Sequence, residues 1–207
     1  MISRRAFLSA LLSLGAVTAG RRPVFAGADL LPAEPWAEKL VAAARGQVGV
    51  TLLYDPRYQS IAYPGGDVPR SLGVCTDVIV RAYRDGLGLD LQKLVHEDMK
   101  RAFSAYPKKW GLKSTDWNID HRRVPNLQTF FRRKGSELPV STDAGDYRPG
   151  DIVTQTVAGN LPHIVIVSNQ MNPDATRPLV IHNIGMGAQI EDTLFAFPIT
   201  GHYRYPG

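Results

Sequence analysis

The hydrophobic periodicity of the chain changes near Gly135, and this change constrains the fold more than any other feature of the sequence. Before it, apolar residues recur at helical spacing, which predicts helices at about 36–48, 75–85, 90–106 and 126–134. After it come short β-runs, which predict strands at 151–157, 163–168, 179–184 and 199–205. Helices followed by a mostly antiparallel sheet are typical of the α+β class.

The amino-terminal segment has the pattern of an export signal. Residues 3–9 match the twin-arginine pattern, and an apolar stretch at 6–19 is too short to span a bilayer as an ordinary helix. A small-residue cleavage site ends at Ala26. We therefore expect residues 1–26 to be a twin-arginine signal peptide and 27–207 to be a single periplasmic domain without stable membrane insertion. A signal retained as a membrane anchor is the alternative.

Charge is distributed unevenly along the chain. There are 24 basic and 19 acidic residues, but four arginines precede residue 26, so the exported part is nearly neutral. Residues 93–134 hold 11 basic and 4 acidic residues, which favours an anionic partner; a solvated helix face is the alternative. The sequence contains no haem, iron–sulfur or dinucleotide motif, so we expect no cofactor, and we expect no nucleic-acid partner.

Cys75 is the only cysteine in the chain. An exported protein can form disulfides, but one cysteine cannot bridge within its own chain. It is therefore an intermolecular link, a buried bystander or a reactive thiol. Gly73 and Val74 lead into a helical pattern, so the sulfur is expected at a helix N-terminus, where free N–H groups and the helix dipole stabilise a thiolate. This setting favours a reactive thiol.

A thiol nucleophile needs a base, and the second half of the chain offers histidines on strands. His163 begins an apolar run, and His182 lies in a second one. Alternation places His182 on the face of Val180, while Asn183 points the other way. Two neighbouring strands can bring both imidazoles to the helix end that carries Cys75. The alternative is that both are satisfied core histidines.

These residues resemble the papain-like, NlpC-type cysteine peptidases of bacterial cell walls. The segments that carry the resemblance are Tyr63-Pro64-Gly65-Gly66, Cys75, Pro149-Gly150-Asp151, His163-Ile164-Val165-Ile166 and Ile181-His182-Asn183. More closely, residues 54–205 resemble an exported bacterial family of unknown function related to that group. The resemblance implies a papain-like fold, with N-terminal helices packed on a C-terminal antiparallel sheet.

The chain departs from the NlpC pattern in several places. Thr76-Asp77 replaces Ser-Gly after the nucleophile, Val74 replaces Asp, and Val165 replaces a strand glycine beside His163. A basic helical insert occupies about 89–135. Asp77 can either raise the pKa of the thiol or pair with a basic residue.

The resemblance implies hydrolysis of an amide through a Cys-His-His site. Cys75 attacks the carbonyl, His163 exchanges protons, and His182, or alternatively Asn183, orients His163. The backbone N–H of Cys75 is a candidate oxyanion donor, with the hydroxyl of Tyr54 or Tyr63 as a second donor. Peptidoglycan stem peptides are the expected substrate.

Two arginines of the basic segment are candidate substrate ligands. Stem peptides carry carboxylates, and the guanidinium groups of Arg122 and Arg123 can bind carboxylates with two hydrogen bonds. Surface salt bridges to Asp116 or Asp120 are the alternative role for these arginines.

Three other functions compete with the hydrolase. A metal hydrolase can be built from His163, His182, Asp151 and His202, but the sequence lacks tight ligand spacing and we expect no metal. A catalytically inactive cell-wall-binding or scaffolding protein would tolerate the departures around Cys75. An acyltransferase or thioesterase can use the same Cys-His pair.

Overall fold

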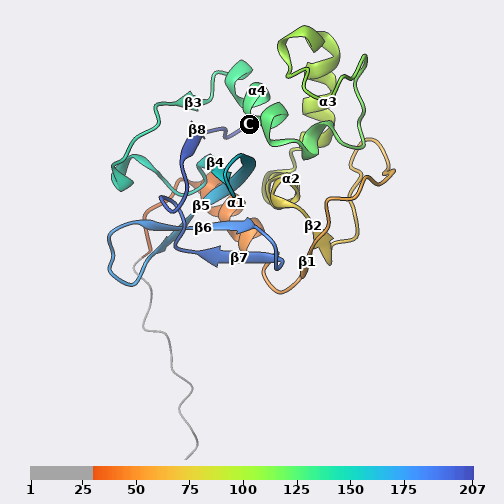
Figure 1. The fold of residues 1–207 in the computed structure, drawn as a ribbon. Helices are drawn as coiled ribbons and strands as arrows, with labels where there is room; N and C mark the ends of the chain where they lie inside the picture. Colours follow the sequence, from red (N-terminus) through yellow and green to blue (C-terminus); the bar gives the residue numbers. More distant parts are fainter. Residues whose placement is uncertain (1–29) are drawn as a thin grey trace, which may run out of the picture.

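The computed structural model describes residues 30–207, so the expected export signal at 1–26 lies outside the described part of the chain. Four α-helices and a six-stranded antiparallel sheet form the body of the fold (Figure 1). The mixed α and β architecture is thus confirmed, with the helices preceding the large sheet in the chain. No helix within 30–207 is long and apolar enough to cross a membrane.

The four helices lie where the apolar spacing predicts them, with ends shifted by a few residues. The third helix begins after Asp90, whose side chain accepts a hydrogen bond from the Gln92 N–H, as the sequence suggests. It ends earlier than expected, and a short 3₁₀ turn follows. The helices are α1 (Pro35–Arg45), α2 (Cys75–Leu87), α3 (Leu91–Arg101) and α4 (Val124–Arg133).

The large sheet has the order β3-β8-β4-β5-β6-β7, and every neighbouring pair is antiparallel. Its strands are β3 (Glu137–Leu138), β4 (Ile152–Val157), β5 (Leu161–Met171), β6 (Pro178–Asn183), β7 (Ala188–Glu191) and β8 (Ile199–Tyr203). The four expected strands are confirmed, whereas β3 and β7 were not expected. A separate parallel pair joins β1 (Leu53–Tyr54) to β2 (Leu72–Gly73).

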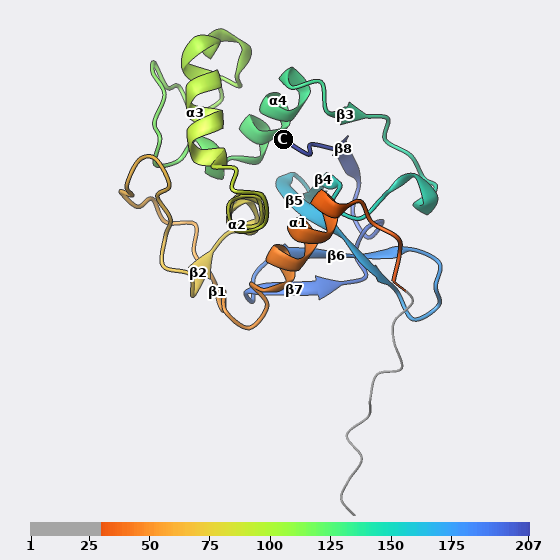
Figure 2. The ribbon, with the colours of Figure 1, turned by 180° about the vertical axis from the view of Figure 1, so that it is seen from behind.

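The end of α2 differs from its sequence-based prediction. The sequence predicts an end near residue 85, just before Gly86, but the helix continues to Leu87, and Gly88 caps it with a positive φ of 69°. Gly86 has a different role, because a Cβ there would lie 2.7 Å from the Lys39 carbonyl oxygen of α1. The glycine therefore permits the close packing of α1 on α2. Figure 2 shows α1 in front of the sheet and α2 beside it.

Hydrophobic clusters bury both faces of the sheet. On one face, Ile164 and Ile166 of β5 pack with residues of α1, α2 and α4 in the main cluster. On the other face, Val165 and Val167 pack in a second cluster with Tyr147. Burying each of these aliphatic side chains stabilises the fold by roughly 1.5–3 kcal/mol. The two clusters hold β5 rigidly, and β5 begins beside the candidate site.

The basic segment at about 89–135 contributes to the main core. It contains α3, α4 and a 3₁₀ turn at Asp120–Arg122, and Phe130 and Phe131 of α4 are fully buried in the main cluster. The hydroxyl of Tyr83 of α2, which stacks near Phe131, donates to the Tyr205 carbonyl. This segment is therefore part of the folded body of the protein.

Candidate functional site

The first turn of α2 places Cys75 at the start of the helix. The Val74 N–H donates a 2.7 Å hydrogen bond to the Asp77 carboxylate, which caps the helix from within its own first turn. The Thr76 hydroxyl donates to the Arg122 carbonyl, which fixes the same turn to the segment before α4. These bonds hold the sulfur at the helix N-terminus, as the sequence indicates.

Asp77 forms a buried ion pair with Arg122. The Arg122 guanidinium donates two 2.9 Å bonds to the carboxylate and further bonds to the carbonyls of Asp55 and Arg57. Both charged side chains are almost fully buried. Arg122 therefore binds the protein itself, and neither the expected substrate clamp nor the alternative surface salt bridge describes it. Asp77 pairs with a basic residue, as one of its two expectations states, and it also raises the pKa of the thiol, as the other states.

The Cys75 thiol is buried, with 4% of the residue exposed. Burial raises the pKa of the thiol to about 12, and the nearby Asp77 charge adds to this effect. Hydrogen bonds from the backbone of Ile164, Thr76 and Cys75 lower the pKa, as expected at a helix N-terminus, but they are outweighed. The thiol is therefore neutral at pH 7, in contrast to the thiolate that the helix position alone suggests.

The histidines of β5 and β6 form a hydrogen-bonded chain that ends on β7. The His163 Nε2 lies 2.7 Å from the His182 Nδ1, and the His182 Nε2 lies 2.7 Å from the Glu191 carboxylate. A carboxylate accepts, so the His182 Nε2 carries the proton and its Nδ1 accepts one from the His163 Nε2. This arrangement leaves the His163 Nδ1 unprotonated, with a lone pair available to a reacting group.

Burial keeps both imidazoles neutral. Burial, together with the neighbouring His182, lowers the pKa of His163 to about 3. Burial also lowers the pKa of His182, although Glu191 opposes this shift. Because both pKa values are lowered, both imidazoles are uncharged at pH 7.

The thiol lies against the start of β5. The backbone of Ile164 hydrogen-bonds the sulfur, and Pro162 lines the same cavity as Cys75. His163 lies between these two residues in the chain, but it does not line the cavity, and strand alternation places its side chain on the face of Val165. Within residues 30–207, no hydrogen bond joins the sulfur to either imidazole.

The two candidate tyrosines lie in different places. Tyr54 lines the cavity of Cys75, and burial, together with the nearby Cys75 and Asp77, raises the pKa of its hydroxyl to about 12. Tyr63 instead packs its ring against His96 and Trp117, at centroid distances of 5.1 and 5.9 Å. The structure therefore brings Tyr54, and not Tyr63, to the thiol.

Asn183 and His182 point to opposite sides, as strand alternation predicts. The Asn183 side chain donates a 3.0 Å bond to the Gly73 carbonyl, two residues before Cys75. It therefore ties β6 to the start of α2. His182, and not Asn183, is the residue that hydrogen-bonds His163.

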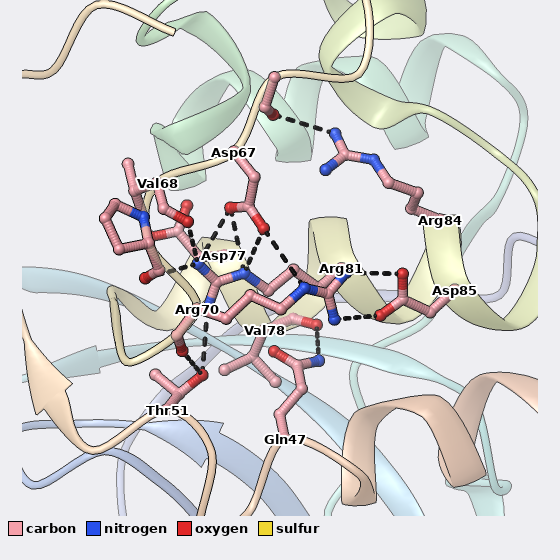
Figure 3. Close-up of polar contacts among 12 residues, drawn as sticks. Gln47, Thr51, Asp67, Val68, Arg70, Asp77, Val78, Arg81, Arg84 and Asp85 are labelled. Carbon is pink, nitrogen blue, oxygen red and sulfur yellow. Dashed lines mark hydrogen bonds and ion pairs between the residues drawn. The ribbon is translucent and has the colours of Figure 1, made fainter.

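A buried arginine of α2 fastens the loop that carries Tyr54. Figure 3 shows the Arg81 guanidinium between Asp67, the Val68 carbonyl and the Thr51 hydroxyl, with bonds of 2.9 to 3.1 Å. Arg81 itself is fully buried. The loop is thus anchored to the helix that presents the thiol.

Arg123 differs from Arg122 in having no acidic partner. Its guanidinium carbon lies 4.1 Å from the centroid of the Trp110 ring, and the residue is only half-buried. It lines the Cys75 cavity and forms no salt bridge with Asp116 or Asp120 in the described residues. Of the two expected arginines, only Arg123 has a guanidinium available to a ligand.

The residues of the competing metal site are divided between two clusters. Asp151 accepts a 2.7 Å bond from the His202 Nε2 and two from Arg204. Asp151 also accepts a hydrogen bond from the Arg148 N–H, which caps the turn before β4. Within residues 30–207, no group of three or more His, Cys, Asp or Glu side chains is arranged to hold a metal ion.

The Cys75 cavity has a volume of about 210 Å³. A larger cavity of about 560 Å³ lies around Trp36, Tyr147 and Arg148 and contains neither Cys75 nor a histidine. The larger cavity therefore offers neither a thiol nucleophile nor a histidine base. We take the smaller cavity as the candidate active site because Cys75 lines it.

Comparison with known proteins gives a family for the chain. Residues 41–205 match the family described as a domain of unknown function, DUF1287. The chain belongs to this family. It is also similar to the uncharacterized protein YijF of Escherichia coli strain K12, with 56% identity over 162 residues, or 78% of each chain. No solved structure matches it significantly.

Three residues of this DUF1287 site were not expected from the sequence. Glu191 lies on β7, a strand too short and too mixed in polarity for alternation to reveal. Lys109 and Trp110 lie in an irregular segment that only the fold brings to Cys75. The one available signal was the local basic charge around Lys109.

Proposed function

We propose that this DUF1287 protein is an exported cysteine hydrolase that cleaves amide bonds, with Cys75 as nucleophile, His163 as base and His182 as the residue that orients it. A papain-like arrangement, as in the NlpC-type peptidases, is part of this proposal. The observation that supports it is the chain from His163 through His182 to Glu191, which leaves the His163 Nδ1 without a hydrogen bond among the described residues, one position before Ile164, whose backbone hydrogen-bonds the sulfur.

The proposed reaction starts from an uncharged pair. The His163 Nδ1 takes the thiol proton as the sulfur attacks the amide carbon, so the C–S bond forms while the carbonyl electrons move to oxygen. The N–H of Cys75 and the hydroxyl of Tyr54 stabilise this oxyanion. The C–N bond then breaks, and His163 gives its proton to the leaving amine.

Water completes the cycle. His163 takes a proton from a water molecule, which attacks the thioester carbon, and the C–S bond breaks with return of that proton to sulfur. The products are a carboxylic acid and an amine. The resemblance to cell-wall peptidases and the expected export favour peptidoglycan stem peptides as the substrate.

The decisive experiment is incubation of the protein with defined muropeptides, with the products read by mass spectrometry. We expect a gain of one water across an amide, and we expect Cys75→Ser to abolish it. The matched control is Ser168→Ala, which removes a buried hydroxyl further along β5. No product from any muropeptide or simple peptide amide would contradict the proposal.

A second candidate is a catalytically inactive cell-wall-binding protein. The specific observation that favours it is the burial of the thiol, which raises its pKa to about 12. Iodoacetamide distinguishes the two functions, because an active site requires Cys75 to be alkylated at pH 7 in the folded protein. Wall binding that persists in Cys75→Ser, together with an unreactive thiol, would favour the binding protein.

A further inference from the structure

Arg123 is a half-buried cation that forms no salt bridge among the described residues; burial lowers its pKa, and the charges of Asp120 and Asp116 oppose this shift. Among residues 30–207 no hydrogen bond or ion pair engages its guanidinium, and its Nη1 atom is shielded from solvent. Buried polar groups nearly always have a hydrogen-bond partner, so a bound ligand is one way to provide a partner for this Nη1 atom. Among the described residues, the guanidinium makes a cation–π contact with Trp110, with its carbon 4.1 Å from the centroid of the ring.

The cavity that Arg123 lines is cationic at one side and apolar elsewhere. Lys109 also lines it, with its amine 4.9 Å from the Trp110 ring, and no Asp or Glu is among the lining residues. Arg122 lines it too, but its charge is neutralised by Asp77. Apart from Tyr54, Cys75 and Trp110, the other lining residues are apolar: Pro56, Val74, Ile119, Val124, Pro125 and Pro162.

We propose that the Cys75 cavity is a carboxylate subsite, in which Arg123, assisted by Lys109, binds a free carboxylate of the molecule whose amide faces Cys75. This inference rests on the proposed function and assigns its substrate class. Guanidinium binds a carboxylate through two parallel hydrogen bonds, and stacking on Trp110 holds the guanidinium plane in place.

The size of the cavity limits the substrate further. At about 210 Å³ it is smaller than the roughly 300–1,000 Å³ typical of sites for drug-sized ligands. It accommodates a small terminal residue and not a long extended peptide. The preferred scissile amide is therefore the one adjacent to a small residue with a free carboxylate.

Ligand titration tests the subsite without requiring catalysis. The protein is titrated with N-acetylglycine, N-acetylglycinamide and inorganic phosphate, and the indole N–H signal of Trp110, assigned with Trp110→Phe, is followed by NMR. We expect saturable binding of the carboxylate, at least tenfold weaker binding of the amide and of phosphate, and loss of binding in Arg123→Gln. Equal binding of the carboxylate and the amide, or tighter binding of phosphate, would overturn the proposal.

Matched variants separate charge from folding. Arg123→Lys keeps a cation and should retain part of the affinity, whereas Arg101→Gln removes an arginine that is exposed and does not line the cavity. Arg101→Gln should bind N-acetylglycine as the unmodified protein does. Equal loss in Arg123→Gln and Arg101→Gln would show that general charge, and not the subsite, attracts the anion.

Alkylation and hydrolysis separate this inference from the proposed function. Arg123→Gln should lower the ratio of the iodoacetate to the iodoacetamide rate at Cys75 by about tenfold, because only iodoacetate carries a carboxylate. Binding of N-acetylglycine without any hydrolysis would refute the hydrolase and leave the subsite standing. Equal hydrolysis of carboxylate and carboxamide substrates would refute the subsite and leave the hydrolase standing.

Discussion

Two histidine clusters of this protein use the same residue types in opposite ways. The His202 ring places its Nε2 on Asp151 and its Nδ1 on the Pro139 carbonyl, and both of these partners are acceptors. The His163 ring meets one imidazole through its Nε2, which leaves its Nδ1 as a free lone pair.

This difference shows that the partners of a buried histidine, and not its burial, determine what it can do. His202 is 1% exposed and His163 is 2% exposed, so burial does not separate them. A ring with two acceptors is committed to an ion-pair network with Arg204 and stabilises the sheet. A ring with one free nitrogen is suited to proton transfer. The predictions below test this contrast.

The largest expected effect is on catalysis. His163→Ala removes the proposed base, and we expect kcat/KM to fall by about 10³-fold or more on whichever amide the protein cleaves. His202→Ala should leave kcat/KM within a fewfold per folded molecule. Steady-state kinetics measure both, with the folded fraction from circular dichroism. A similar loss of activity per folded molecule in the two variants would remove the functional distinction.

The second effect is on stability. Asp151→Ala leaves His202 and Arg204 without their buried carboxylate, and breaking such a pair costs about 3–5 kcal/mol of unfolding free energy. Urea unfolding measures the loss. Asn172→Ala, which removes a half-buried network at the β5–β6 turn, is a milder comparison. A loss below about 1 kcal/mol for Asp151→Ala would contradict the structural role of this cluster.

The third effect is a pH dependence of stability. The pKa of His163 is lowered from 6.5 to about 3, so below pH 6.5 the unfolded chain binds a proton that the folded chain does not. Stability should therefore fall as pH drops from about 6.5 towards 3, at about 1.4 kcal/mol for each unit of pKa difference.

His121 contributes in the same window, because burial lowers its pKa to about 3 as well. His163→Ala should thus flatten the decline only in part, and His163→Ala with His121→Ala should flatten it further. Urea unfolding at several pH values provides the measurement. A slope unchanged in both variants would mean that neither ring resists protonation in the folded state.

The smallest expected effect concerns Glu191. Its side chain is 37% exposed, so water can replace it in Glu191→Ala, and we expect kcat to fall only about tenfold with little change in KM. Glu191→Gln can still accept the His182 N–H and should lose less. An activity equal to that of the unmodified protein in both variants would remove Glu191 from the histidine chain.

Local pattern was sufficient for most elements because the helices and long strands each bury a periodic apolar face. The N-cap role of Asp90 and the opposite directions of His182 and Asn183 follow from such local rules and are confirmed. Strand β7 escaped prediction because only four residues pair with β6, and their polarity shows no clear alternation. With β7 missed, its Glu191 was missed too.

Local pattern was misleading where a neighbour from elsewhere in the chain takes part. Gly86 signals a helix end in sequence, but it serves the approach of α1. An arginine in a basic segment is expected at the surface, but Arg122 is buried, where it pairs with Asp77 and donates to two loop carbonyls. The thiol has the helix position of a thiolate, yet desolvation by the surrounding core raises its pKa.

The amino-acid sequence by itself determined the order of the helices and strands and which face of each is buried, because these depend on residues close together in the chain. It also singled out Cys75, His163 and His182. Only the tertiary structure decided which charges are neutralised, which histidine nitrogen is free and which arginine remains available to a ligand. Those properties depend on groups that are distant in the chain, such as Asp77 and Arg122, 45 residues apart, and on the exclusion of water between them.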